Sequence, residues 1–167
     1  DAWRDGAQET VVAVTDSRIR SSVTQWLGGS VPGKGHSERR GRLELPFVPF
    51  VTQARYDELL WSCDWNFVRG EDSFVRAQWA ARPFAWQIYP QAENVHRVKL
   101  EAFLDRWCER LDVPAVVPMR RLWLAWNGMG GSGGDANLGD CGVAWRTLAT
   151  HQPALREDGT RAFARLR

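Results

Sequence analysis

The sequence predicts an α/β fold, in which a parallel sheet is covered by helices on both sides. Strand-like runs of β-branched and aromatic residues alternate with runs of helical period, and the connections between them are short. The run at 65–68 lacks clean alternation, which is typical of a strand buried on both faces of a parallel sheet. A chain of 167 residues with 44% hydrophobic residues can also bury a substantial core.

The first part of the chain contains two strand-like runs. Residues 10–14 form a β-branched run, and residues 43–48 form the second strand. Between them, a helix with an apolar stripe begins after residue 17 and stops at two glycines. Residues 28–41 are rich in glycine, serine and charge, which predicts a surface loop. A further helix begins near residue 52.

The second part continues the alternation. A third strand at 65–68 precedes a helix at 73–81, and a fourth strand at 84–88 precedes a long helix with one apolar face. From about 118 to 167 the pattern is helical, interrupted by a glycine-rich run. We therefore predict one domain over residues 1–167 with a helical C-terminal segment.

Composition excludes several classes of protein. No apolar run approaches the ~18 residues that a membrane-spanning helix needs, and the N-terminus lacks the residue order of a signal peptide. The three cysteines are not closely spaced, which argues against a disulfide framework or a zinc site. We therefore predict that the protein is located in the cytoplasm, where disulfides are rare. The histidines show no metal-ligand spacing. A net charge of +2 is too small for a surface that attracts nucleic acid.

One glycine-rich run matches a dinucleotide-binding fingerprint only formally. Residues 128–133 have the spacing G-x-G-x-x-G. They follow residues 122–127, which read as a helix, whereas the fingerprint must follow a strand. We therefore interpret the run as a helix–helix loop.

The segment at 66–74 is the most informative. It runs from the carboxyl end of a strand through Gly70 to a helix N-terminus, where parallel sheets bind ligands. The free N–H groups at the helix N-terminus, together with Arg69, favour binding of a phosphate. Glu71 and Asp72 would repel a phosphate, but their carboxylates could bind the hydroxyls of a ligand that carries both groups, as a nucleotide sugar does. The alternative is a plain helix cap, with Asp72 or Ser73 capping, Glu71 complementing the helix dipole and Arg69 paired with either carboxylate.

Neighbouring strand ends add candidate ligand-binding residues. Tyr89 follows the next strand, and Phe50 and Gln53 follow the strand before. The aromatic rings could stack on a base, and the amide could hydrogen-bond to its edge. Ten tryptophans also suit stacking on planar ligands. Cys63 lies on an apolar helix face and is expected to be buried and inert.

Four runs of the sequence are similar to those of one enzyme family: residues 56–64, 66–80, 88–91 and 96–104. In these runs the chain resembles the elongation factor P arginine rhamnosyltransferases. The match is dense between about residues 45 and 107, and the run Arg-Gly-Glu-Asp-Ser in its strand–helix context is highly specific.

The resemblance implies a fold and a reaction. Family members have a GT-B fold, in which two Rossmann-like domains face each other across a cleft. They transfer L-rhamnose from dTDP-β-L-rhamnose to an arginine of elongation factor P, with inversion at the anomeric carbon and without a metal or another cofactor. The chain resembles the C-terminal, donor-binding domain, truncated at its own N-terminus. The family's general base and main acceptor contacts lie in the N-terminal domain, so we expect this chain alone to be inactive.

The resemblance also assigns roles to individual residues. Seven positions match the family's donor site: Phe50, Gln53, Arg69, Glu71, Asp72, Ser73 and Tyr89. Phe50 and Gln53 would flank the thymine. The diphosphate and adjoining sugar would be held by Tyr89 with Arg69, Asp72 and Ser73. Glu71 resembles a functionally essential glutamate, and Arg69 would stabilise negative charge developing on dTDP during catalysis.

Other functions remain open from the sequence. The chain could be a stand-alone nucleotide-binding module without catalysis, or a GT-B-like sugar-nucleotide epimerase. A nucleic-acid binder is disfavoured by the low net charge and the absence of a clustered basic stripe. Donor specificity distinguishes these functions, because an epimerase would prefer a UDP-sugar to dTDP-rhamnose.

Overall fold

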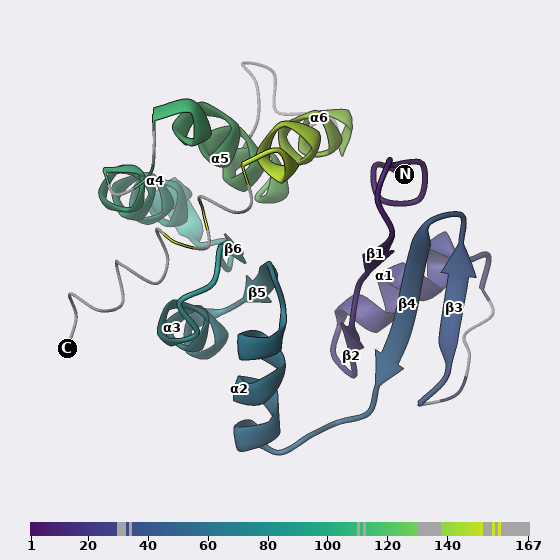
Figure 1. The fold of residues 1–167 in the computed structure, drawn as a ribbon. Coiled ribbons are helices and arrows are strands. Elements are labelled where there is room, and N and C mark those ends of the chain that lie inside the picture. The colour runs from purple at the N-terminus through teal and green to yellow at the C-terminus, as the bar shows by residue number, and fades with distance from the viewer. Residues whose placement is uncertain are drawn as a thin grey trace. The chain divides into compact units, whose positions relative to one another are not determined.

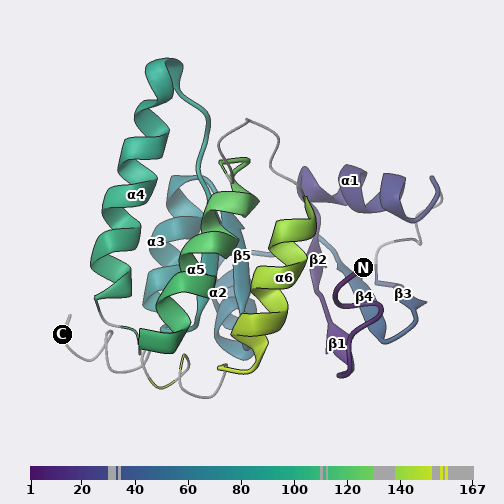
Figure 2. The same cartoon turned by 90° about the horizontal axis from the view of Figure 1, so that it is seen from above.

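The computed structural model describes residues 1–29, 33, 35–109, 111, 113–129, 138–151, 155 and 157. The chain divides into two compact units, Asp1–Tyr56 and Asp57–Arg167 (Figures 1 and 2). Both units combine helices with parallel strand pairs, which confirms the predicted α/β class. The single donor-binding domain expected over residues 1–167 stays a prediction. No helix in the described part of the chain is long and apolar enough to cross a membrane.

The N-terminal unit is a small sheet with β4 (Leu43–Val48) at its centre. β1 (Thr10–Val11) and β2 (Val14–Thr15) pair with β4 in parallel and in the same register, so they are two parts of one interrupted strand. β3 (Ser37–Arg40) pairs with β4 in the antiparallel direction, and Figure 1 shows it on the side of β4 opposite to β1 and β2. α1 (Ile19–Trp26) follows β2.

Strict alternation along β4 builds the core of this unit. Leu43, Leu45 and Phe47 are buried, whereas the residues between them are partly exposed. Val14 joins them in the core, and Val23 of α1 packs against this cluster. The period of two thus places one face of β4 in the core.

The prediction of a loop over residues 28–41 is wrong for β3. This strand is polar and largely exposed, so its composition is that of a loop although its backbone pairs with β4. Two turn residues join the strands, and the first of them, Gly41, has a φ of +57°. Tight hairpins favour glycine at such a position.

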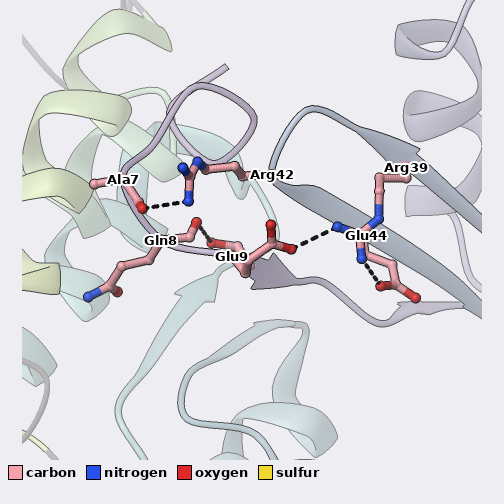
Figure 3. A network of polar contacts seen from close by, with 7 residues as sticks. Ala7, Gln8, Glu9, Arg39, Arg42 and Glu44 are labelled. Atoms are coloured by element: carbon pink, nitrogen blue, oxygen red, sulfur yellow. Dashed lines mark hydrogen bonds and ion pairs between the residues drawn. The ribbon is translucent and has the colours of Figure 1, made fainter.

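An ion pair and a hydrogen bond join the N-terminal segment to this hairpin, and a second ion pair lies within the hairpin (Figure 3). The Arg39 guanidinium donates hydrogen bonds to Glu9 and Glu44, both at 2.7 Å. Arg42 Nη1 donates to the carbonyl oxygen of Ala7 at 3.0 Å. Because these side chains are exposed, we expect each ion pair to contribute only about 0–1 kcal/mol to stability.

The C-terminal unit is built on a parallel strand pair. β5 (Asn66–Arg69) and β6 (Phe84–Gln87) pair in parallel and are joined through α3 (Glu71–Trp79). α5 lies between α4 and α6 in both views (Figures 1 and 2). The remaining elements, in chain order, are α2 (Gln53–Ser62, which begins in the N-terminal unit), the short 3-10 helix η1 (Ala92–Asn94), α4 (Val95–Cys108), α5 (Val113–Trp126) and α6 (Leu138–Ala149).

Some boundaries differ from the sequence prediction. α3 begins two residues before the expected residue 73 and ends at Trp79. The helical C-terminal part begins with α5 at Val113 rather than near 118, and Pro118 lies inside that helix instead of starting it. The strand predicted at 84–88 ends at Gln87.

Aromatic rings cover both faces of the β5–β6 pair. On one face, Phe84 contacts Phe74 of α3 and Phe103 of α4, with ring centroids 6.0 and 6.2 Å apart. On the other, Phe67 contacts Trp126 of α5 and Trp145 of α6 at 4.8 and 5.7 Å. The expected helices on both sides are therefore present, and packing against other aromatic rings accounts for several of the tryptophans.

Candidate functional site

The candidate site lies at the turn between β5 and α3. Arg69 is the last residue of β5, Gly70 is the N-cap, and α3 begins at Glu71. Gly70 has φ +75° and ψ −178°, a conformation that is essentially restricted to glycine. A Cβ at Gly70 would also lie 2.9 Å from both Cε2 and Oη of Tyr89. The turn therefore requires glycine for two independent reasons.

Two strand ends meet at this turn. Tyr89 lies two residues beyond β6, and its ring packs against Gly70. The Arg69 guanidinium lies over the same ring, 5.1 Å from its centroid. Tyr89 is 43% exposed, and Arg69 is also exposed. The contact is a cation–π interaction that leaves positive charge at the carboxyl edge of the strands.

The start of α3 does not have the arrangement expected of a plain helix cap. Gly70 occupies the N-cap position, so neither Asp72 nor Ser73 does. No ion pair among the described residues joins Arg69 to Glu71 or Asp72. Glu71 and Asp72 lie in the first turn of α3, where carboxylates complement the helix dipole. Ser73 is half-buried in the same turn.

Buried residues behind the turn fix its shape. Trp86 Nε1 donates a hydrogen bond to the carbonyl oxygen of Gly70 at 2.9 Å, and this contact is buried. The Gly70 N–H donates to the carbonyl of Gln87 at 3.2 Å. Phe74 stacks on Trp86 with the ring centroids 4.0 Å apart. The backbone of the turn is thus held by β6, although sequence reasoning gave Trp86 no role in the site.

Asn127 in turn holds the end of β6. It directly follows α5, and its Nδ2 donates to the carbonyl of Trp86 at 2.7 Å. Its Oδ1 accepts from the N–H of Ile88 at 2.9 Å. One helical turn earlier, Trp123 Nε1 donates to the carbonyl of Phe84 at 2.8 Å. Side chains of the α5 segment therefore satisfy backbone groups of β6 that would otherwise form an open edge.

An arginine links α3 to α2 beside the turn. Arg76 Nε donates to Asp72 Oδ2 at 3.0 Å, and Nη1 donates to both carboxylate oxygens of Asp57 at 2.9 and 2.8 Å. The Arg76 side chain is only 15% exposed, whereas that of Asp72 is 73% exposed. The Asp57 hydrogen bonds are the largest cause of a raised pKa at Arg76. The spacing Asp72 to Arg76 could have revealed this pair in the sequence.

The other predicted donor-site residues lie in the N-terminal unit. Phe50 follows β4 and is 84% exposed, and Gln53 is the first residue of α2. The structure therefore brings five of the seven predicted residues to one turn region, namely Arg69, Glu71, Asp72, Ser73 and Tyr89.

The remaining sequence candidates have other environments. Gly128 and Met129 follow α5, which is the helical context expected for the formal fingerprint, and residues 130–133 lie outside the described residues. Within the described ranges, no group of three or more His, Cys, Asp or Glu side chains could hold a metal ion. Cys63, Cys108 and Cys141 are not in disulfide bonds. Cys63 directly follows α2 and is half-buried rather than buried as expected, whereas Cys108 is buried. Burial raises the pKa of the Cys63 and Cys108 thiols.

Comparisons with known proteins give consistent matches. Residues 1–166 match the family model described as Elongation-Factor P (EF-P) rhamnosyltransferase EarP. A protein-arginine rhamnosyltransferase of Pseudomonas aeruginosa is 42% identical over 95% of this chain, and one of Pseudomonas putida is 43% identical over 94% of it. A solved structure concerning EarP-mediated arginine glycosylation of translation elongation factor EF-P superimposes with a TM-score of 0.83 and 39% identity, over 98% of this chain.

The matches cover only part of those proteins. This chain spans 40% of the length of the P. aeruginosa relative and 39% of that of the P. putida relative. It spans 49% of the chain in the solved structure.

Proposed function

The chain belongs to the Elongation-Factor P (EF-P) rhamnosyltransferase EarP family, and we propose that it forms the donor-binding part of a protein-arginine rhamnosyltransferase. In this proposal the donor is dTDP-β-L-rhamnose and the acceptor is an arginine of elongation factor P. The names of the relatives support the reaction class, and the match to about two fifths of their length supports assigning the chain one part of the enzyme. The cytoplasmic location predicted from cysteine usage belongs to the same proposal.

The observation that best supports donor binding is the turn after β5. Arg69 presents a guanidinium beside the N-terminus of α3, where first-turn N–H groups and the helix dipole favour an anion. Tyr89 packs on Gly70 and supplies an aromatic ring at the same edge. We propose that the diphosphate of dTDP-rhamnose binds there, in contact with Arg69, Tyr89 and the start of α3.

The same groups suit the bond-breaking step. An arginine nitrogen of the acceptor gives up a proton to the general base, which the resemblance places in the N-terminal domain of the full enzyme, and attacks the anomeric carbon of rhamnose. The bond from that carbon to the phosphate oxygen breaks, and dTDP leaves with the bonding electron pair. Negative charge then grows on the leaving phosphate, where Arg69 and the N–H groups of α3 would stabilise it. We place Glu71 near the sugar, because a carboxylate binds hydroxyls better than phosphates. We propose that this reaction requires no metal and that the chain binds neither nucleic acid nor a membrane.

The proposal also assigns two residues of the N-terminal unit to the donor. Phe50 and Gln53 would contact the thymine, by stacking and by hydrogen bonding respectively. Phe50 is 84% exposed, and an aromatic ring without cover is available to a planar ligand. The proposal assigns Ser73 to the diphosphate and Asp72 to hydroxyls of the adjoining sugar, because a carboxylate repels phosphate.

Calorimetric titration of this chain tests the donor assignment. We expect it to bind dTDP and dTDP-rhamnose in preference to UDP. Arg69→Ala should weaken dTDP binding by roughly ten- to a hundredfold, because a charge-assisted hydrogen bond contributes about 1.5–3 kcal/mol. Preference for a UDP-sugar would instead indicate an epimerase, and failure to bind either nucleotide would refute the donor site.

Transfer is tested in a chimera. The matching region of the P. aeruginosa relative is replaced by this chain, and rhamnosylation of elongation factor P is followed by mass spectrometry. We expect activity in the chimera and a large loss of turnover in its Glu71→Gln variant with dTDP affinity retained. Normal turnover of Glu71→Gln would contradict a role for this carboxylate, and dTDP binding without transfer would favour a binding module.

A further inference from the structure

The first turn of α3 carries two carboxylates, Glu71 and Asp72, at the place where we propose that a diphosphate binds. The carboxylates and the diphosphate are both negatively charged, so they would repel each other. Carboxylates stabilise a helix N-terminus when it is empty, but they repel a phosphate that binds there. Asp72 is 73% exposed on this turn, so its charge faces the medium from which a nucleotide would arrive. Binding therefore depends on what compensates Asp72.

Arg76 contacts Asp72 directly. It lies one helical turn further along α3, and its Nε donates to Asp72 Oδ2 at 3.0 Å. Residues at this spacing share one flank of a helix, so the bond draws the carboxylate toward that flank. Arg76 is itself fixed, because its Nη1 contacts both oxygens of Asp57 on α2 at 2.9 and 2.8 Å. Its side chain is only 15% exposed.

We propose that Arg76, anchored by Asp57, is a positioning residue that compensates Asp72 and so allows a nucleoside diphosphate to bind at the start of α3. The inference rests on the proposed donor site. Arg76 does not touch the nucleotide in this account, since its guanidinium is committed to the two aspartates. It acts through Asp72 by holding the carboxylate in place and neutralising its charge. The fork of the guanidinium matters, because a lysine cannot contact three oxygens on two elements in the same way.

The test is a double-mutant cycle on this chain, with dTDP as the ligand and calorimetry as the measurement. Arg76→Gln should weaken dTDP binding about tenfold, as expected when one charge beside a phosphate loses its compensation. In the Asp72→Asn background the same change should have little effect, because residue 72, the first-turn side chain that Arg76 contacts, then carries no charge. Arg76→Lys should give an intermediate loss.

A matched control separates this effect from the general loss of positive charge. Arg120 of α5 forms a comparable interhelical pair with Asp105 of α4 at 2.6 Å. Arg120→Gln makes the same change in charge in the same unit, and we expect it to leave dTDP affinity within about twofold of the wild type. Circular dichroism of each variant verifies that its helices are intact.

The outcomes separate this inference from the proposed function. If the wild type binds dTDP and Arg76→Gln binds equally well, the inference is overturned and the donor site stands. Equal losses from Arg76→Gln with and without Asp72→Asn would also overturn it, because they would indicate a structural or long-range role. If Arg76→Gln does not fold, Asp57→Asn, which releases the anchor but keeps Arg76, should still weaken binding, and unchanged affinity would refute the inference. Failure of the wild type to bind dTDP would overturn both proposals.

Discussion

Replacing Gly70 by alanine tests how the β5–α3 turn is built. At φ +75° and ψ −178°, an L-residue is held in a sparsely populated region of backbone space, which costs about 1–3 kcal/mol. The new Cβ would also lie 2.9 Å from two atoms of Tyr89. Because this ring is 43% exposed, it can swing outward, and it would then lose its contact with Arg69. That cation–π interaction contributes about 0.5–1 kcal/mol at an exposed site.

We therefore expect Gly70→Ala to lower the free energy of unfolding by about 1.5–4 kcal/mol. Guanidinium unfolding followed by tryptophan fluorescence measures this change. Gly128→Ala is the matched control, since Gly128 has φ +72° and a Cβ there meets nothing within 4 Å. The control should lose only about 1–2 kcal/mol. A loss at Gly70 below ~0.5 kcal/mol would refute the backbone argument, and a loss no larger than the control's would refute the contribution of the Tyr89 contact.

Two further predictions concern the C-terminal unit. Asn127→Ala should destabilise the chain by about 2 kcal/mol, because it leaves a carbonyl and an N–H of the β6 segment without their partner, and the same unfolding measurement checks it. Unchanged stability would mean that water replaces the amide. Cys63 and Cys108 should react slowly with iodoacetamide at neutral pH, because burial raises their thiol pKa and leaves little thiolate, and labelling should accelerate on unfolding. Complete labelling of the folded chain within minutes, read by mass spectrometry, would contradict this.

The local sequence determined much of this protein. The run at residues 43–48 predicted a strand, and β4 occupies these same residues. The glycine between a strand and a helix predicted the turn at Gly70, because few other residues adopt that backbone conformation. The resemblance in the run 69–73 indicated the family. Each of these signals lies within a short stretch of sequence, so it can be recognised without knowledge of the fold.

The tertiary structure decided the rest. β3 is polar on a sheet edge, and only pairing with β4 distinguishes such a segment from a loop. The residues that shape the site also act over long separations in sequence: Asn127 holds β6 from the end of α5, and Arg76 reaches Asp57 on α2. A hydrogen bond between a side chain and a distant element produces no periodic pattern in the sequence. Neither residue type is unusual at its position, so the sequence does not mark the pair. Only the fold determines that these groups meet.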